Sequence, residues 1–500
     1  MMIKLKPQYL LIGLLLFICS CISKSKEQQQ EKKPNILFIA IDDLRPELGC
    51  YGNQIIQTPN IDRLANDGVL FSNHYVTVPT CGASRYGLLT GKLPAAVEDL
   101  NNNVMVHKIT KNKENKSPET FIHHLRNHGY YTVGIGKISH HPDGLVYGYQ
   151  EKSDNAPLEL PYSWDEMLLN PGKWKTGNNA FFGYADGSNR NSLNKKVKPY
   201  EQIAESDDDY VDGLSANLAT QKLKEFKKHN KPFFLGVGFF KPHLPFNAPK
   251  KYWDLYERDS IPLSTGAELP ENVHMASMNN NGELNQYLLG DEKPTLKEPA
   301  TDAYARKLKH AYYASVSYID AQVGKVLKAL KDQGLYENTI VVLWGDHGWQ
   351  LGDHHMWGKH ACFEKALHSP LIIKMPGSMN EGQSVNSNIV STIDIYPTIM
   401  DMAGLEMPYE TKGRSLEPLL TATQDENWEN VAFSYYRKGI SLRTKKYRLT
   451  KYFRKQKPVI ELFNYEDDPD ELHNIAAGRH KLIDSLTPLW EAGNTGLYQN

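Results

Sequence analysis

Runs of apolar residues alternate along the chain with segments in which apolar residues recur every three or four positions. Residues 35–41, NILFIAI, form a continuous apolar run, which is typical of a strand buried in a parallel sheet. Residues 60–71, NIDRLANDGVLF, follow with the spacing of an amphipathic helix. Residues 119–137 then predict a helix, a glycine stop and a strand.

The same alternation continues to about residue 377. Strands are expected at 232–240, 339–345 and 370–377, and helices at 214–230 and 304–331. Strands that alternate with helices predict an α/β fold, in which a mostly parallel sheet is sandwiched by helices. Residues 143–209, rich in Gly, Asn, Pro and Trp, interrupt the pattern and predict a long insertion.

Beyond residue 424 the pattern changes to short strands in the segments VAFSYYR, ISLRTKKYRLTKYF and VIELFNY. These strands predict a smaller C-terminal α+β subdomain. We therefore divide the body of the chain into a main domain over residues 34–424 and a subdomain over residues 425–500.

The first residues have the pattern of an export signal. Lys4 and Lys6 precede the apolar run LLIGLLLFI (10–18), which is too short to span a bilayer but fits a signal-peptide core. The sequence Ile-Cys-Ser-Cys that ends at Cys21 resembles a bacterial lipobox, in which Cys21 becomes the lipidated first residue. An ordinary secretory signal is the alternative. We expect a lipoprotein signal peptide over 1–21, a flexible tether over 22–33, and a periplasmic, outer-membrane or cell-surface location.

Charge and cysteine content narrow the choices. The 57 Lys and Arg nearly balance the 58 Asp and Glu, so no overall field attracts nucleic acid, which we exclude as a partner. An anionic substrate therefore needs a local cluster of charge. Two of the five cysteines lie in the leader, and the remaining Cys50, Cys81 and Cys362 cannot all pair. At least one of these thiols is unpaired or chemically altered.

Charged residues and histidines follow four of the expected strands. They are Asp42 and Asp43 after the first strand, Lys137, His140 and His141 after the second, Lys241 and His243 after the third, and Asp346 and His347 after the fourth. Each group alone is more typical of a helix cap or a turn. Ligands in open α/β sheets bind beyond the carboxyl ends of the strands, so together the groups indicate an active site.

The segment CGASRYGLLTG (81–91) resembles the signature of the type I sulfatases, Cys-x-(Pro/Ala)-Ser-Arg followed by Leu-Thr-Gly. In that family a maturation enzyme oxidises the cysteine to formylglycine. The resemblance extends over the chain, through residues 35–53, 58–71, 345–354 and 461–476. KPHLPF and the Asp-His pair resemble the branch that contains iduronate-2-sulfatases and choline-sulfatases. The fold it implies is alkaline-phosphatase-like, with the main domain as the catalytic domain.

The resemblance implies a nucleophile made from Cys81 and one divalent cation. The implied metal ligands are Asp42, Asp43, modified Cys81, Asp346 and His347. Carboxylate oxygens suit calcium, whereas histidine is an atypical calcium ligand and keeps magnesium as an alternative.

The resemblance also implies catalytic roles. Arg85 stabilises the anion of the hydrated aldehyde, and Lys137 and Lys359 clamp sulfate oxygens. His140 removes the proton of the second hydroxyl, and His243 protonates the leaving alkoxide. Two placements stay open, because His141 follows His140 and because position 359 has other histidines nearby.

We therefore expect a lipid-anchored sulfatase that acts on a sulfated oligo- or polysaccharide, such as ulvan, carrageenan or glycosaminoglycan fragments. Its other expected partners are a formylglycine-generating enzyme and a membrane that holds Cys21. One alternative is a phosphodiesterase or phosphonate hydrolase of the same superfamily. Another is a glycan-binding lipoprotein without catalytic activity.

Overall fold

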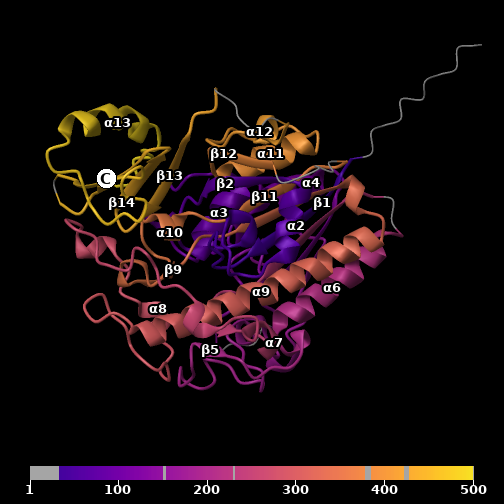
Figure 1. Cartoon of the computed structure of the whole chain (residues 1–500). Helices are drawn as coiled ribbons and strands as arrows, with labels where there is room; N and C mark the ends of the chain where they lie inside the picture. The colour runs from indigo at the N-terminus through magenta and orange to yellow at the C-terminus, as the bar shows by residue number, and fades with distance from the viewer. Residues whose placement is uncertain are drawn as a thin grey trace, which may run out of the picture. The chain divides into compact units, whose positions relative to one another are not determined.

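An eight-stranded sheet lies at the centre of residues 34–500, with strand order β12-β2-β11-β8-β1-β6-β3-β4 (Figure 1). Neighbouring strands run parallel except β11, which is antiparallel to both β2 and β8. The expected mostly parallel sheet is confirmed. The strands are β1 (Asn35–Ile41), β2 (Val69–Tyr75), β3 (Tyr131–Gly136), β4 (Glu166–Leu168), β6 (Phe233–Phe239), β8 (Thr339–Gly345), β11 (Leu371–Lys374) and β12 (Ser384–Ser391).

The computed structural model describes residues 33–149, 154–228, 231–377, 384–421, 427–455 and 457–498. The expected signal peptide and nearly all of the expected tether lie outside these residues, as does the expected boundary between residues 424 and 425. Within the described ranges, no helix has the length and apolar character needed to cross a membrane.

Helices cover both faces of the sheet, as its apolar strands require. Alternate residues of β1 show the two faces, since Leu37 and Ile39 join one hydrophobic cluster and Ile36 and Phe38 join the other. The first face is covered by α2 (Pro59–Asp67), α6 (Val211–Phe226) and α9 (Asp302–Asp332). The second is covered by α3 (Cys81–Thr90), α4 (Phe121–Asn127), α11 (Ile395–Met402) and α12 (Glu417–Thr421).

The loops contain further short elements. These are β5 (Tyr200–Glu201), β7 (Phe246–Asn247), β9 (Gln350–Leu351), β10 (Trp357–Gly358), α5 (Gly177–Phe181), α7 (Lys250–Trp253), α8 (Gly282–Asn285) and α10 (Glu364–Leu367). β5 and α5 lie in the insertion expected at 143–209, and β4 of the same insertion pairs with the edge of the main sheet at β3.

Two local expectations differ from the structure. The helical spacing over 60–71 holds only to Asp67, and Val69–Tyr75 forms strand β2. This strand pairs with β11 and β12, so pairing in the sheet overrides the helical pattern of its first residues. The strand expected at 370–377 forms as β11 but runs against its neighbours.

The C-terminal α+β subdomain is confirmed. Four antiparallel strands, β13 (Val431–Tyr436), β14 (Gly439–Thr444), β15 (Tyr447–Tyr452) and β16 (Val459–Asn464), pack against α13 (His480–Ala492). The Trp490 indole N–H donates a hydrogen bond to the Ile440 carbonyl at 2.9 Å. Val78 and Ala83, beside the start of α3, belong to the same hydrophobic cluster. The subdomain therefore packs on the segment that carries Cys81.

A buried ion network also joins the subdomain to the main sheet. Arg448 of β15 is fully buried, with one guanidinium nitrogen 2.5 Å from Glu364 Oε2 and Nε 2.7 Å from Glu471 Oε1. The Tyr75 hydroxyl of β2 donates to Glu364 Oε1 at 2.7 Å. Every charge in this network is therefore compensated by a neighbour.

Arg448→Met should lower the free energy of unfolding by about 3–5 kcal/mol, because it leaves the buried Glu471 carboxylate without its cation. Chemical denaturation followed by fluorescence measures the change. Lys446→Met is the matched control, since Lys446 pairs with Glu466 at the exposed surface of the same sheet and should have no measurable effect. Equal unfolding midpoints for the wild type and Arg448→Met would contradict this interpretation of the network.

Candidate active site

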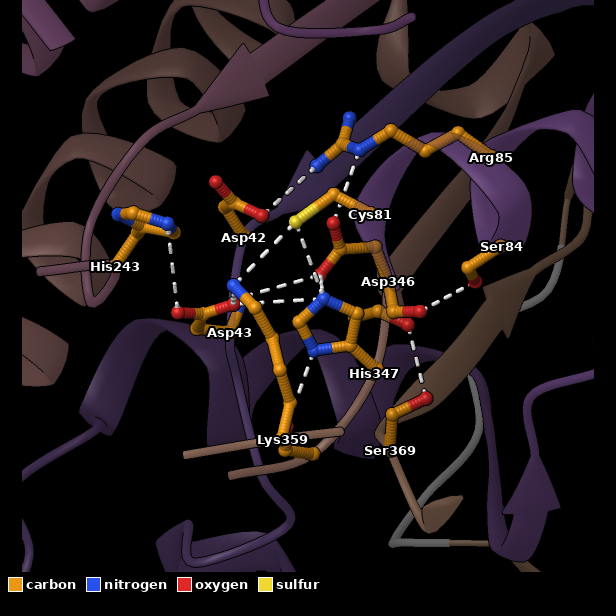
Figure 2. A network of polar contacts seen from close by, with 12 residues as sticks. Asp42, Asp43, Cys81, Ser84, Arg85, His243, Asp346, His347, Lys359 and Ser369 are labelled. Carbon is orange, nitrogen blue, oxygen red and sulfur yellow. Dashed lines mark hydrogen bonds and ion pairs between the residues drawn. The ribbon is translucent and has the colours of Figure 1, made fainter. Parts of the chain in front are cut away.

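The four parallel strands β8, β1, β6 and β3 are neighbours and end at one edge of the sheet. Asp42 and Asp43 follow β1, Lys137 follows β3, His243 lies just after β6, and Asp346 and His347 follow β8. All six side chains are buried. Figure 2 shows five of them, Asp42, Asp43, His243, Asp346 and His347, close together at this edge, and Lys137 Nζ contacts Asp42.

Cys81 is the first residue of α3, and Arg85 lies one turn later. The Cys81 Sγ atom is 3.3 Å from His347 Nε2 and 3.4 Å from Lys359 Nζ. Arg85 Nε donates to Asp346 Oδ2 at 3.0 Å, and another guanidinium nitrogen lies 3.7 Å from Asp42 Oδ1. The motif thus delivers a sulfur atom and a fixed cation to the same cluster.

The small residues of the motif allow close packing. A Cβ atom on Gly82 would lie 2.4 Å from the Asn102 carbonyl oxygen, and the Gly82 N–H donates to Asn102 Oδ1 at 2.9 Å. The Ser84 hydroxyl donates to the main-chain carbonyl of Asp346. These contacts tie α3 to the loops beside it.

Asp43 has a left-handed backbone, with φ of 60°. Its N–H donates to Asp346 Oδ1 at 3.0 Å, and its carbonyl accepts from the Tyr312 hydroxyl at 2.7 Å. Aspartate tolerates this conformation better than most residues, and such strain is typical of functional sites. Lys359 Nζ donates to Asp43 Oδ1 at 2.8 Å, as Lys137 Nζ does to Asp42 Oδ2 at 2.5 Å.

Two buried carboxylate oxygens, Asp42 Oδ1 and Asp43 Oδ2, have no hydrogen-bond partner among the described residues. One ligand atom from each of Asp42, Asp43, Cys81 and His347 lies within 4.8 Å of the others. A bound cation would compensate buried oxygens that have no hydrogen-bond donor. These residues therefore fit a divalent cation.

The fifth expected ligand, Asp346, is held differently. Its Oδ1 accepts from the Asp43 N–H and its Oδ2 accepts from Arg85, while Oδ1 lies 3.6 Å from His347 Nε2. Asp346 thus fixes the Asp43 backbone and the Arg85 side chain from inside the cluster.

The two adjacent carboxyl groups differ in electrostatic environment. Burial raises the pKa of Asp42, but Lys137, His243 and Arg85 together hold it well below its usual range. The pKa of Asp43 is raised, because burial and the charge of Asp42 outweigh Lys359. Asp43 is therefore the carboxyl group that a further cation would help most to ionise.

The unmodified thiol at position 81 is a poor nucleophile. Burial, with the charge of Asp42, raises the pKa of Cys81 to about 12. A cysteine nucleophile requires the thiolate, which is scarce at neutral pH under these conditions.

The structure distinguishes the two adjacent histidines. The His141 main-chain N–H donates to Glu159 Oε2 at 2.8 Å, and its Nδ1 lies 3.1 Å from Glu159 Oε1. His140 Nδ1 is buried and has no hydrogen-bond partner among the described residues. Burial and the charge of Lys137 hold the pKa of His140 well below its usual range, so its ring is neutral. His141 Nδ1 also lacks a hydrogen-bond partner among the described residues, but it faces the Glu159 carboxylate, whereas no ion pair of His140 occurs in this part of the structure.

Lys359 is also distinct from its neighbours. His354 Nε2 and His355 Nδ1 are hydrogen-bonded to the Asp470 and Leu296 carbonyls, and the His360 ring stacks on Tyr436. Lys359 instead has its ammonium group beside Asp43 and Cys81 (Figure 2).

Two further charged residues belong to the cluster: Lys241, which the sequence placed at the active-site edge without a role, and Glu283, which it did not indicate. Lys241 is buried behind His243, where its ammonium donates to the His243 carbonyl at 3.0 Å, and burial lowers its pKa to about 8. Glu283 of α8 places Oε1 3.0 Å from His243 Nε2 and 3.4 Å from Lys359 Nζ. Lys241 could be found because it follows an expected strand, as the other charged groups of the site do. Glu283 lies in a polar segment with no periodic pattern, so the sequence does not indicate it.

A glycine directs Lys137 into the site. Gly136, with φ of 71°, ends β3, and a Cβ atom there would lie 2.3 Å from the Gly238 carbonyl oxygen. The Lys137 N–H donates to that same carbonyl at 3.1 Å. Only glycine suits this turn and close approach, so the strand can end where Lys137 reaches Asp42.

A cavity of about 350 Å³ lies beside Lys137 and His140. Its other lining residues are mostly amides and aromatic side chains, among them Asn102, Asn103, Tyr147, Tyr149, Asn178 and Phe181. Such a lining provides hydrogen-bonding groups for hydroxyls and flat apolar surfaces.

The chain is similar to known proteins over most of its length. A family model described as "Sulfatase" matches residues 34–405, and one described as "N-sulphoglucosamine sulphohydrolase, C-terminal" matches residues 352–487. Iduronate 2-sulfatase of Homo sapiens is 31% identical over 420 residues, which cover 78% of this chain and 72% of that protein.

Two solved structures have the same fold. The phosphonate monoester hydrolase of Agrobacterium radiobacter aligns with a TM-score of 0.73 at 21% identity, over 93% of this chain and 95% of that chain. BT4656, solved with its substrate D-glucosamine-2-N,6-O-disulfate, aligns with a TM-score of 0.68 at 22% identity, over 93% and 98%.

Asp43→Asn should abolish tight binding of a divalent cation, because it removes the charge of a buried oxygen that lacks a donor. Metal content after dialysis against calcium measures the loss. A thermal scan gives a second readout, since calcium at a hundredfold excess over Kd should stabilise the wild type by about 2.7 kcal/mol and leave the variant unchanged.

Asp320→Asn is the matched control for metal binding. Asp320 is a buried aspartate of α9 that accepts the N–H groups of Asn60 and Ile61, so its loss should lower stability without changing metal content. Full calcium occupancy in Asp43→Asn would show that the cation is held elsewhere.

Proposed function

Because the chain belongs to the sulfatase family and is a sulfuric ester hydrolase, we propose that it removes sulfate from a sulfated saccharide. The observation that carries the proposal is the position of Cys81 at the start of α3, among the carboxylates, His347 and Lys359. The names of the relatives support a saccharide, and so does the cavity of amides and aromatic side chains beside Lys137. Sulfated polysaccharides such as ulvan, carrageenan or glycosaminoglycans are the proposed source.

We propose further that a maturation enzyme converts Cys81 to formylglycine. Hydrated formylglycine supplies the hydroxyl that attacks sulfur, while a divalent cation at the predicted ligands would hold sulfate oxygens and lower the pKa of that hydroxyl. The raised pKa of the Cys81 thiol supports this need for modification.

Three fixed cations surround the reacting position. Arg85 lies on the Asp346 side, Lys137 on the Asp42 side, and Lys359 Nζ reaches within 3.4 Å of the sulfur atom of residue 81. Donors that are already oriented in a buried site stabilise charge on sulfate oxygens without reorganisation. Lys359 is thus assigned to a sulfate oxygen, and Arg85 to the hydroxyl anion at residue 81.

The two histidines are assigned opposite proton transfers. His243 Nδ1 lies 2.6 Å from the Leu244 carbonyl, which can only accept, so Nδ1 carries a hydrogen. A second hydrogen, at Nε2 beside Glu283, is the one that His243 would donate to the leaving oxygen. Neutral His140, with an unpartnered Nδ1, accepts the proton released at residue 81. One group therefore gives a proton to the alcohol and the other receives one.

The alternatives have less support. Activity on phosphonate esters rests on likeness of fold alone, at 21% identity. The comparison of matched sulfate and phosphonate esters distinguishes the two activities. A glycan-binding protein without catalysis is set aside by the family match.

Export and a lipid anchor are proposed on the sequence of residues 10–21 alone. Cys21 is the proposed site of the lipid, and a polysaccharide substrate outside the cytoplasm agrees with that location.

Co-expression with a formylglycine-generating enzyme should yield a peptide about 18 Da lighter at residue 81, because CHO replaces CH2SH. Mass spectrometry of a tryptic digest measures the shift. Cys81→Ala should lose all turnover and keep its fold by circular dichroism. Cys362→Ala is the control, since this buried thiol lies in another hydrophobic cluster and should affect stability but not the modification. An active preparation with an intact thiol at residue 81 would refute the proposal.

His243→Ala and His140→Ala should differ in their kinetics on substituted phenyl sulfates. Loss of a general acid costs roughly 100- to 10,000-fold and hurts poor leaving groups most, so His243→Ala should steepen the dependence of kcat/KM on leaving-group pKa. His140→Ala should leave that slope unchanged and instead show a stoichiometric burst of phenol followed by slow turnover.

Stopped-flow measurement of phenol release gives both readouts for the two histidines. His141→Ala is the control, because its side chain pairs with Glu159. Identical slopes for the two variants, with a burst in neither, would mean that the roles are assigned wrongly.

A further inference from the structure

The carboxylate of Glu283 contacts two groups that the proposed reaction uses. Its Oε1 lies 3.0 Å from His243 Nε2 and 3.4 Å from Lys359 Nζ. Its side chain is only 16% exposed, and its Oε2 is buried with no hydrogen-bond partner among the described residues. Glu283 comes from α8, an element that contributes none of the predicted site residues.

The hydrogen bonding of His243 requires a proton at this contact. The Leu244 carbonyl, 2.6 Å from Nδ1, can only accept, so Nδ1 carries a hydrogen. A bare Nε2 and a bare carboxylate oxygen would then face each other at 3.0 Å as two acceptors. Burial and the charge of Lys359 lower the pKa of His243 to about 4, whereas the Glu283 carboxylate raises it, because that carboxylate favours a ring with a hydrogen at Nε2.

Few other groups restrain the His243 ring on its Nε2 side. Phe181 packs against it with ring centroids 4.5 Å apart, and Asp43 Oδ2 is 3.9 Å from Nε2, beyond hydrogen-bonding distance. Among the described residues, Glu283 is the one acidic group within hydrogen-bonding distance of Nε2. Loss of this carboxylate would leave the ring held by Nδ1 and by packing alone.

A second cation is a less suitable occupant of this position. Asp43, His243 and Glu283 do place ligand atoms within 4.8 Å of one another. However, Lys359 Nζ contacts both carboxylates, at 2.8 Å from Asp43 and 3.4 Å from Glu283. The ammonium group already supplies the positive charge that a metal would bring there.

We infer that Glu283 is a positioning residue, which holds His243 Nε2 and Lys359 Nζ on one oxygen and so fixes the proton that the leaving alcohol takes. The inference rests on the proposed function. The leaving oxygen replaces Glu283 as acceptor of the Nε2 hydrogen, so the proton moves from nitrogen to oxygen as the S–O bond breaks. Glu283 remains beside Lys359 and acts through these two side chains.

The test uses the full chain, matured by a formylglycine-generating enzyme, and a series of 4-nitrophenyl, 4-chlorophenyl, phenyl and 4-methoxyphenyl sulfates. Glu283→Gln keeps the shape of the side chain but removes the charge. It should lower kcat/KM for 4-methoxyphenyl sulfate roughly 10- to 100-fold, the worth of a hydrogen bond to a charged group, and 4-nitrophenyl sulfate much less. A defect in folding alone would lower kcat/KM equally for all four substrates.

A double-mutant cycle with His243→Ala isolates the coupling. If Glu283 acts through His243, Glu283→Gln should not steepen the leaving-group slope further in the His243→Ala background. Additive slopes would overturn the inference. Glu298→Gln is the matched control, an exposed glutamate of the following loop that should change neither slope nor melting temperature.

The outcomes separate this inference from the proposed function. No turnover of any sulfate by the matured wild type refutes the proposed function. A second outcome refutes only the role of Glu283. In it the wild type turns over sulfates and His243→Ala has a steep dependence of kcat/KM on leaving-group pKa, but Glu283→Gln keeps the wild-type dependence. If Glu283→Gln does not fold, Glu283→Asp, which withdraws the oxygen from both partners, should show the same steepened slope.

Discussion

The site depends on the compensation of buried charge. Asp42, Asp43 and Asp346 are fully buried, and an ionised carboxylate in such surroundings is costly unless it is paired. Lys137, Lys359 and Arg85 each contact one of them from a different segment of the chain. The pKa of Asp43 is nevertheless raised, so the cluster needs further positive charge, and the three cations also give the site a local attraction for an anionic ester.

The fold holds this cluster from several directions. Four neighbouring parallel strands end at it, Gly136 lets Lys137 turn inward, and Tyr312 of α9 fixes the left-handed backbone at Asp43. The C-terminal subdomain contributes indirectly, because its hydrophobic cluster includes Val78 and Ala83 on either side of Cys81. Its packing therefore supports α3, the helix that carries Cys81.

The leaving-group side of the site is built from loops. His243 comes just after β6, Lys359 lies after β10, and Glu283 lies in α8, so three separate segments meet on one carboxylate oxygen.

The sequence by itself determined the sheet, its coverage by helices, and the set of charged groups at the strand ends, because buried strands and amphipathic helices have distinct local patterns. The motif at Cys81 gave the family and hence the expected roles of distant residues. Tertiary structure decided the pairing of β2 and β11, the pairing of His141 rather than His140 with Glu159, and the placement of Lys359. Each depends on which partners lie across space: β12 beside β2, Glu159 beside His141, and Asp43 beside Lys359. Glu283 had no local signal at all, because its contacts with His243 and Lys359 exist only once three loops have folded together.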